Sequence, residues 1–284
     1  MSKILTHLGD MPIADFLRDY WQQKPLFIRQ AFPNLQLPID ATEFAGLAYD
    51  TDTARLVIEK GGKTPWEVRH GPLRKKDFKL PETHWTLLIN DMEQLMPELS
   101  ELIEPFRFIP DWRIDDLMIS YAVEGGSVGP HIDAYDVFLL QAQGKRRWQI
   151  STHSCGEDNF LPNVDLRIMR EFIPEQEWIV EPGDLLYLPP NVPHYGVALN
   201  ECMTCSIGFR APSRADLLED LLGELIDRPE MQQRFSDAGR QTQADPSIIS
   251  EQDLEKLTDF ILNALPDRKT IKHWLQNHLS NTED

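Results

Sequence analysis

The chain has 284 residues, with 46 acidic against 28 basic side chains and a formal net charge of −18. This charge argues against binding nucleic acid through phosphates, which needs clustered lysine and arginine, and it favours basic partners unless it serves solubility alone. No run approaches the roughly 18 to 20 uninterrupted apolar residues of a membrane span. With three cysteines and no signal-peptide pattern at its start, the chain is expected to be a reduced, cytoplasmic protein.

The pair Cys202-x-x-Cys205 is compatible with a redox or zinc site, but the sequence has no second such pair. The surrounding segment has the pattern of a strand, in which residues three apart face opposite sides. We therefore interpret these cysteines as ordinary buried thiols.

The first part of the chain alternates between helical and extended patterns. Apolar residues at helical spacing predict a helix within 12–23, and residues 24–32 are expected to form a strand. A second helix is predicted to begin at Asp40, where Glu43 completes a capping box. A helical period within 92–106 then interrupts a long series of short apolar runs. The runs predicted as strands are 54–60, 85–90, 115–123, 136–143, 145–151, 177–182, 184–190, 194–199 and 203–209.

Short strands without regular helices between them favour a barrel or a double-sheet sandwich over a parallel α/β sheet. The expected fold class is therefore mainly β with α, in which residues 1–210 form the β-domain with its N-terminal helices. Residues 211–284 are expected to form a separate helical module. Its predicted helices are 214–226, 229–238, 250–265 and 267–279.

The segment "GPHIDAYD" places His131 two residues before Asp133. Acidic residues occupy 46 of 284 positions, so this pair alone would arise by chance about one time in six. A second segment, "EPGDLLYLPPNVPHYG", adds weight because a glycine turn and a proline-rich break direct a strand toward His194. Glycine-bounded segments thus frame both parts of a candidate metal site.

His131 and Asp133 are expected to share one face of a strand. With His194 from a neighbouring strand, two imidazoles and one carboxylate would form the facial triad of non-haem Fe(II) enzymes, a set unlike a closed structural zinc site. The alternative is that His131 is a turn residue and His194 a packed surface ring.

The segment "GKRRWQI" predicts an anchor for an acidic co-substrate. Arg146 shares a strand face with Trp148 and is expected to point inward, whereas Arg147 points outward. A buried guanidinium needs a carboxylate, and the C5 carboxylate of 2-oxoglutarate would fit. An internal Asp or Glu is the alternative partner. Ser120, on what we expect to be the adjoining strand, is the main candidate for an added hydroxyl donor, and Thr204 and Ser206 are weaker ones.

Four segments together resemble the JmjC-type, cupin-fold 2-oxoglutarate oxygenases, and among them the bacterial ribosomal oxygenases. They are "PDWRIDDLMIS", "GGSVGPHIDAYDVFLLQAQGKRRWQI", "EPGDLLYLPPNVPHYG" and "SIGFRAPSR". The resemblance implies a double-stranded β-helix with Fe(II) held by His131, Asp133 and His194, and with 2-oxoglutarate anchored by Arg146 and Ser120. It also implies a protein hydroxylase that modifies the β-carbon of an arginine in a large-subunit ribosomal protein.

The resemblance further implies a homodimer formed by the helices after residue 210, followed by a winged-helix domain that is reduced or truncated in this sequence. A JmjC-type demethylase, with "TPWEVRHGP" and Tyr135 as a possible cage, and a non-catalytic metal-binding cupin remain as alternatives. Asp115 and Asp116 could line an arginine pocket or could be solvated residues at a strand start.

Overall fold

The computed structural model describes residues 4–61, 65–153, 156–162, 164 and 166–280. The chain divides into two compact units, Met1–Ala211 and Pro212–Asp284. Within the described residues, no helix is long and apolar enough to cross a membrane.

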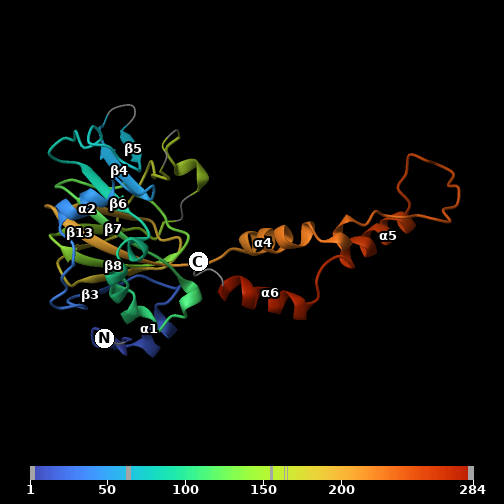
Figure 1. Ribbon diagram of the computed structural model, residues 1–284, viewed down its shortest axis with the longest axis horizontal. Helices are drawn as coiled ribbons and strands as arrows, with labels where there is room; N and C mark the ends of the chain where they lie inside the picture. The colour runs from blue at the N-terminus through green and yellow to red at the C-terminus, as the bar shows by residue number, and fades with distance from the viewer. Residues whose placement is uncertain (1–3, 62–64, 154–155, 163, 165, 281–284) are drawn as a thin grey trace. The chain divides into compact units, whose positions relative to one another are not determined.

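The first unit is built on two antiparallel sheets (Figure 1). The larger sheet has eight strands in the order β3-β11-β8-β13-β7-β6-β4-β5, and the smaller sheet has the order β10-β9-β12. The strands of the larger sheet are β3 (Leu26–Ile28), β4 (Ala54–Glu59), β5 (Trp66–His70), β6 (Trp85–Ile89), β7 (Ile114–Ala122), β8 (Asp136–Gln143), β11 (Leu185–Leu188) and β13 (Cys202–Phe209). Those of the smaller sheet are β9 (Arg146–Ile150), β10 (Gln176–Val180) and β12 (His194–Ala198). The predicted double-sheet architecture is confirmed.

Residues alternate across the larger sheet between two separate cores. On β8, Phe138 and Leu140 belong to a core that also contains Phe16 and Phe44 from helices α1 (Ile13–Asp19) and α2 (Ala41–Leu47). The intervening residues of β8 pack instead with Trp148 of the smaller sheet. Because successive strand side chains point to opposite faces, this one strand supports both cores, and the second core lies between the sheets.

The N-terminal segment follows the sequence pattern closely. Helix α2 begins after Asp40, whose side chain accepts hydrogen bonds from the backbone N–H groups of Thr42 and Glu43, and the predicted capping box is present. A two-residue pair, β1 (His7–Leu8) and β2 (Met11–Pro12), precedes α1. Strand β5 was not predicted, because Pro65 and the polar residues around Val68 obscure its alternation.

Two predicted helices are largely absent. Residues 92–106 form only the four-residue α3 (Met92–Leu95) and two 3-10 segments, Pro97–Leu102 and Glu104–Phe106. Each 3-10 segment has a proline at its start, where proline is tolerated but where it prevents a continuous α-helix. Within 229–238, only Pro229–Gln232 is helical, again as 3-10. This stretch is mostly exposed and gains too little packing to stabilise a short helix.

The described residues of the second unit, 212–280, form three α-helices, α4 (Arg214–Ile226), α5 (Glu251–Leu262) and α6 (Arg268–Ser280). Leu221 and Leu225 of α4 pack against Trp274 of α6 to form a small core. The indole Nε1 of Trp274 donates to Glu224 Oε1 at 2.7 Å. The unit therefore has a core of its own.

A buried polar network ties the N-terminal segment to the larger sheet. Asp136, fully buried at the start of β8, accepts hydrogen bonds from the Tyr187 hydroxyl at 2.6 Å, from Gln22 Nε2 at 2.9 Å and from Arg113 Nη2 at 3.0 Å. Burial, followed by the hydrogen bond to Asp136, raises the pKa of Tyr187. Satisfied buried polar networks of this kind fix one packing arrangement.

We expect Tyr187→Phe to destabilise the protein by about 1–3 kcal/mol, because it removes a donor from a buried carboxylate. A urea unfolding curve of the purified protein measures this change. Tyr49→Phe is the control, since Tyr49 is 42% exposed, and it should leave the midpoint unchanged. Equal midpoints for Tyr187→Phe and the unmodified protein would contradict the assignment.

Candidate metal centre and active-site cavity

His131 and Asp133 lie in the loop between β7 and β8 and do not share a strand face, so this part of the sequence prediction is wrong. His131 forms only an isolated β-bridge, in which its N–H donates to the carbonyl of His194 at 3.0 Å and the N–H of His194 donates back at 2.9 Å. Gly129, with φ +80°, turns the chain into this bridge. The backbone N–H of Asn191 donates to the carbonyl of Asp133 at 2.8 Å, which holds the rest of the loop.

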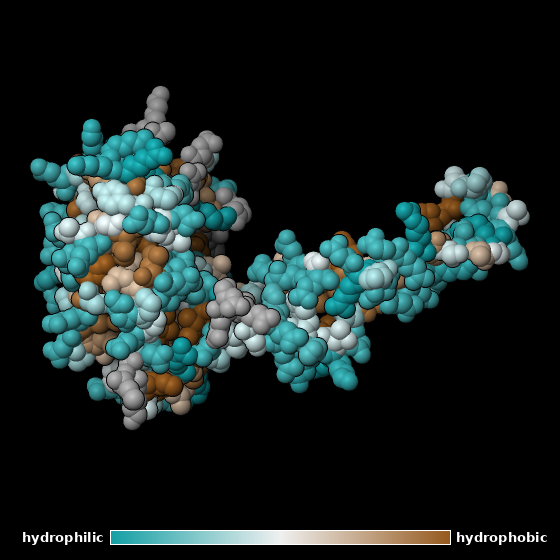
Figure 2. Space-filling model, in the orientation of Figure 1, coloured by the Kyte–Doolittle hydropathy of each residue, from teal (hydrophilic) through white to brown (hydrophobic). Residues whose placement is uncertain are grey.

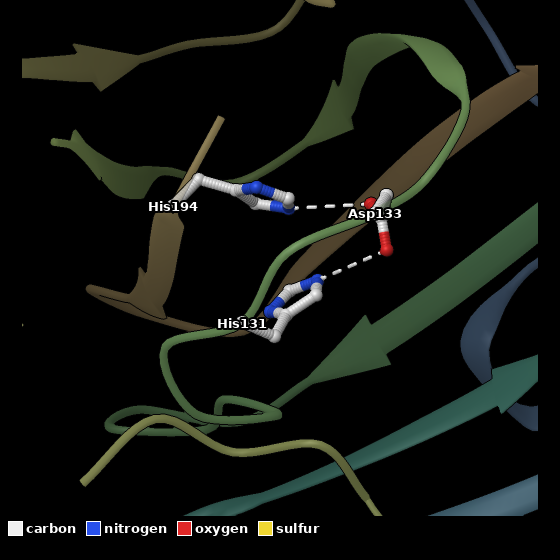
Figure 3. Close-up of side chains that lie close together, drawn as sticks. All are labelled: His131, Asp133 and His194. Atoms are coloured by element: carbon white, nitrogen blue, oxygen red, sulfur yellow. Dashed lines mark ion pairs between the residues drawn. The ribbon is translucent and has the colours of Figure 1, made fainter. Parts of the chain in front are cut away.

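These contacts bring three side chains together from the loop and from β12 (Figure 3). Asp133 Oδ2 lies 3.4 Å from His194 Nε2, and Asp133 Oδ1 lies 3.8 Å from His131 Nε2. The centroids of the two imidazole rings are 4.1 Å apart. One donor atom from each residue falls within 4.8 Å of the others, and this is the only such group of three or more His, Cys, Asp or Glu residues in the described part of the chain.

Backbone carbonyls fix the tautomer of both imidazoles. Nδ1 of His131 donates to the carbonyl of Gly129 at 3.0 Å, and Nδ1 of His194 donates to the carbonyl of Val192 at 2.9 Å. Since a carbonyl can only accept, each Nδ1 carries the proton and each Nε2 keeps its lone pair. Both Nε2 atoms face Asp133. Histidines that bind metals commonly donate their other ring N–H to a carbonyl in this way.

The electrostatic environment favours the neutral imidazole that a metal requires. His194 is almost fully buried, and this burial, followed by the proximity of His131, lowers its pKa to about 4. A set of two imidazoles and one carboxylate suits Fe(II) or Mn(II) and leaves coordination positions open. The residues present therefore fit the metal that the sequence implied.

The three side chains line a cavity of about 280 Å³ between the two sheets. Arg146 and Trp148 of β9 contribute to its lining from the smaller sheet, and Met118 and Ser120 of β7 contribute from the larger one. Its apolar wall includes Val128, Val137, Leu139, Leu88 and Leu166. A cluster of metal-ligand residues beside a mostly apolar cavity is suited to a small co-substrate.

Arg146 points into the cavity, as the strand alternation predicted. It is 6% exposed, and its Nε and Nη2 atoms have no hydrogen-bond partner within the described structure. Its guanidinium lies 5.6 Å from the centre of the Trp148 ring. No acidic side chain of the described residues accepts a hydrogen bond from these two nitrogens. Because burial of an unpaired charge is costly, the site is suited to a ligand with a carboxylate.

Of the three residues predicted to offer a hydroxyl to 2-oxoglutarate, two line the cavity and one does not. Ser120 and Ser206 line the cavity. Ser120 is on the larger sheet, however, and faces Arg146 across the sandwich rather than from an adjoining strand. Thr204 is not among the lining residues, and its hydroxyl donates to Gln141 Oε1 at 3.0 Å. The hydroxyl of Thr204 is thus engaged within the larger sheet.

Asp115 and Asp116 face opposite sides of β7. Asp115 is exposed and pairs with Arg210 at 3.0 Å. Asp116 lies on the inner face with Met118, and its Oδ2 accepts from Asn90 Nδ2 at 2.6 Å. Burial raises the pKa of Asp116 to about 6.

Asn90 links this carboxylate to the cavity, since Asn90 Oδ1 accepts a hydrogen bond from Arg55 Nη2 at 2.8 Å and Arg55 lines the cavity. Tyr135 also lines the cavity, and burial raises its pKa. Sequence reasoning missed Asn90 and Arg55. The only available signal was that they alternate with buried apolar residues.

Cys202 and Cys205 are both buried and free. Burial raises the pKa of Cys205 to about 12, so its thiol stays protonated. This fits the interpretation of both residues as packing thiols.

Comparison with known proteins agrees with this geometry. A JmjC domain model matches residues 101–217. "Ribosomal protein uL16 3-hydroxylase" of Escherichia coli (strain K12) is 38% identical over 267 residues, which cover 94% of this chain and 70% of that protein. The chain belongs to the JmjC-type ribosomal oxygenase family. "Probable ribosomal oxygenase" of Haemophilus influenzae is 42% identical over 210 residues, which span 72% of this chain but only 51% of that protein.

Solved structures of a family member superpose well on this one. The X-ray structure of E. coli ycfD has a TM-score of 0.85 at 36% identity, covering 97% of this chain and 73% of that one. A structure of YcfD described as a complex with cobalt and 2-oxoglutarate has a TM-score of 0.80, also at 36% identity, and covers 96% of this chain and 72% of that one. The double-stranded β-helix that the sequence resemblance implied is therefore confirmed.

Removal of one metal ligand should abolish tight metal binding. We expect His131→Ala and Asp133→Ala each to weaken Mn(II) binding by more than the roughly 10- to 100-fold lost when a group that only orients a ligand is removed. Isothermal titration calorimetry of the purified proteins measures this affinity. His273→Ala, on the exposed side of α6, is the control and should bind Mn(II) normally. Unchanged affinity in either ligand variant would rule out this site.

Proposed function

We propose that this protein is a 2-oxoglutarate- and Fe(II)-dependent oxygenase that hydroxylates the β-carbon of an arginine in a large-subunit ribosomal protein. One observation carries the proposal: the His131, Asp133 and His194 cluster lines the same cavity as Arg146, whose Nε and Nη2 have no hydrogen-bond partner among the described residues. The printed names of the E. coli and H. influenzae relatives support both the reaction and the ribosomal substrate.

In this proposal, His131, Asp133 and His194 hold iron through their Nε2 and carboxylate oxygen atoms. When bound, the iron supplies activation of dioxygen, coupled to the oxidative decarboxylation of 2-oxoglutarate to succinate and carbon dioxide. The protein contributes by orienting both imidazoles through the backbone carbonyls of Gly129 and Val192, and burial lowers the pKa of His194 so that this ring stays neutral. No side chain is needed as a general base.

Arg146 holds the distal carboxylate of 2-oxoglutarate, with Ser120 as a further donor. A guanidinium binds a carboxylate through two parallel hydrogen bonds, which would satisfy the two unpartnered nitrogens. The apolar wall formed by Val137, Leu139 and Trp148 limits the space open to water. Limited water access strengthens the charge pair and reduces unproductive reactions.

Asp116 is suited to receive the guanidinium of the substrate arginine. It lies on the same strand face as Met118 and Ser120, beside Gly208, where an added Cβ would sit 3.2 Å from Asp116 Oδ1. The absence of a side chain at Gly208 leaves this oxygen open to a ligand. Tyr135, on the cavity wall, offers a ring against which a planar cation can stack.

The same proposal extends to the binding partners, the cellular location and the oligomeric state of the protein. An acidic chain of net charge −18 attracts a basic ribosomal protein and repels free nucleic acid, so no direct nucleic-acid contact is proposed. A cytoplasmic location is proposed because the proposed substrate is a ribosomal protein. We also propose that residues 211–284 form a homodimer contact. Large apolar side chains remain exposed on this unit, including Leu218, Leu222 and Ile226 of α4, among predominantly hydrophilic ones (Figure 2).

Two measurements test the function against its rivals. Intact mass spectrometry of ribosomal proteins from cells with and without this gene should show the mass of one added oxygen on one basic protein. A loss of methylene mass would indicate a JmjC-type demethylase instead. Purified protein should release succinate only with Fe(II), 2-oxoglutarate and substrate, whereas a non-catalytic metal-binding cupin would release none.

Arg146→Ala should raise the concentration of 2-oxoglutarate needed for half-maximal turnover by one to two orders of magnitude, since a charge-assisted pair is worth roughly 2–3 kcal/mol. Succinate release measures this requirement. Arg147→Ala is the matched control, because Arg147 faces outward toward Glu177 at 4.0 Å. An unchanged requirement in Arg146→Ala would mean that another residue holds the carboxylate.

Asp116→Asn should raise the KM for the protein substrate by about 10- to 100-fold without changing the affinity for 2-oxoglutarate, because it removes a half-buried charge opposite a guanidinium. Substrate affinity should also fall as the pH drops through about 6, where this carboxyl takes up its proton. Steady-state kinetics at several pH values measure both effects. Asp115→Asn, on the exposed side of β7, should change neither.

A further inference from the structure

We propose that Thr86 of β6 is a third positioning residue for the distal carboxylate of 2-oxoglutarate and donates a hydrogen bond from its hydroxyl. This inference rests on the proposed function, because it assigns another contact in the same cavity. It starts from one observation: Thr86 is fully buried, lines the cavity, and its Oγ1 has no hydrogen-bond partner within the described structure.

An unpartnered buried hydroxyl is unusual and costs stability. Five side-chain atoms of the described residues are buried without a hydrogen-bond partner. Three of them, Thr86 Oγ1 and two nitrogens of Arg146, belong to residues that line this one cavity. Their concentration there indicates that a single polar ligand satisfies all three.

The strand register places Thr86 close to the other anchoring residues. Thr86 pairs with Ala122 on β7, and Ser120, two residues away on the same face, pairs with Leu88. Ser120 and Thr86 are therefore diagonal neighbours across two strands, a separation of roughly 7–8 Å between their Cα atoms. One carboxylate can lie between two hydroxyls at that spacing.

The contact between the two sheets brings Arg146 to the same end of the cavity. Ala122, the partner of Thr86, packs with Ala198 and Cys202 in one small buried cluster. Ala198 in turn pairs with Arg146 on the smaller sheet. Thr86 and Arg146 thus flank this alanine contact from opposite sheets, and both line the cavity beside it.

The alternation of side chains along β6 indicates that the Thr86 hydroxyl serves ligand binding and not core packing. Leu87 and Ile89 point into the core beneath the larger sheet, whereas Thr86 and Leu88 face the cavity. A hydroxyl needed only for folding would be bonded to its neighbours, as the Thr51 hydroxyl is to Thr53. The hydroxyl of Thr86 gains a partner only when a ligand or a water molecule occupies the cavity.

The test measures binding of 2-oxoglutarate to the Mn(II)-loaded full-length protein by calorimetry, so that turnover plays no part. Thr86→Val, which keeps the shape and removes the hydroxyl, should weaken binding by about 10- to 100-fold, the range for a hydrogen bond to a charged group. Thr86→Ser, which keeps the hydroxyl, should bind close to normally. Affinity for 2-oxopentanoate, which has a methyl group in place of the distal carboxylate, should be the same in all three proteins.

Thermal melting of the metal-free proteins provides the second readout. Thr86→Val should melt no lower than the unmodified protein, because removal of an unsatisfied hydroxyl relieves a cost. Thr51→Val, which loses a bonded hydroxyl outside the cavity, should melt lower and bind 2-oxoglutarate normally.

Normal 2-oxoglutarate affinity in Thr86→Val, an equal loss for both ligands, or a failure of Thr86→Val to fold would overturn the assignment of Thr86. Failure of the unmodified protein to bind 2-oxoglutarate would instead refute the proposed function itself. The two failures are therefore distinguishable.

Discussion

Two backbone hydrogen bonds between His131 and His194 are the contact on which the site depends. They join a loop after β7 to the first residue of β12, and thereby bring both imidazoles to one point beside Asp133. Backbone carbonyls two residues before each histidine then fix the tautomer. Ligand position and ligand chemistry both follow from main-chain contacts, which do not depend on mobile side chains and are accordingly well preorganised.

The larger sheet positions most of the other side chains that line the cavity. One face of the larger sheet packs against the N-terminal helices and stabilises the unit. Side chains of neighbouring strands on its other face line the cavity. Thr86, Met118 and Ser120 line the cavity, and Asp116 lies on the same face of β7 as Met118 and Ser120. The smaller sheet adds Arg146 opposite them. The cavity between the two sheets thus combines the cluster of His131, Asp133 and His194 with the buried guanidinium of Arg146.

The same cavity concentrates unsatisfied polar atoms that would be defects in an ordinary core. Within the described part of the chain, Arg146 Nε and Nη2 and Thr86 Oγ1 are buried without hydrogen-bond partners, and burial raises the pKa of Asp116 to about 6. Folding tolerates these groups because the network around Asp136 and two apolar cores stabilise the rest of the unit. Binding cavities typically contain groups that lower the stability of the ligand-free protein, and favourable packing elsewhere in the fold offsets this loss.

The sequence alone determined the double-sheet class, the metal-ligand residues as candidates, and the inward direction of Arg146, because strand alternation, capping and glycine or proline turns are local properties. It also predicted the capping box at Asp40. Only the tertiary structure decided that His131 and Asp133 act from a loop, that Ser120 faces Arg146 from the other sheet, and that Thr204 is engaged by Gln141. The unpartnered hydroxyl of Thr86 and the choice of Asp116 over Asp115 as the inward-facing residue likewise emerged only from the fold. The physical reason is that pairing between strands distant in sequence, and the partners available to a buried hydroxyl, are set by register and packing, which no local pattern encodes.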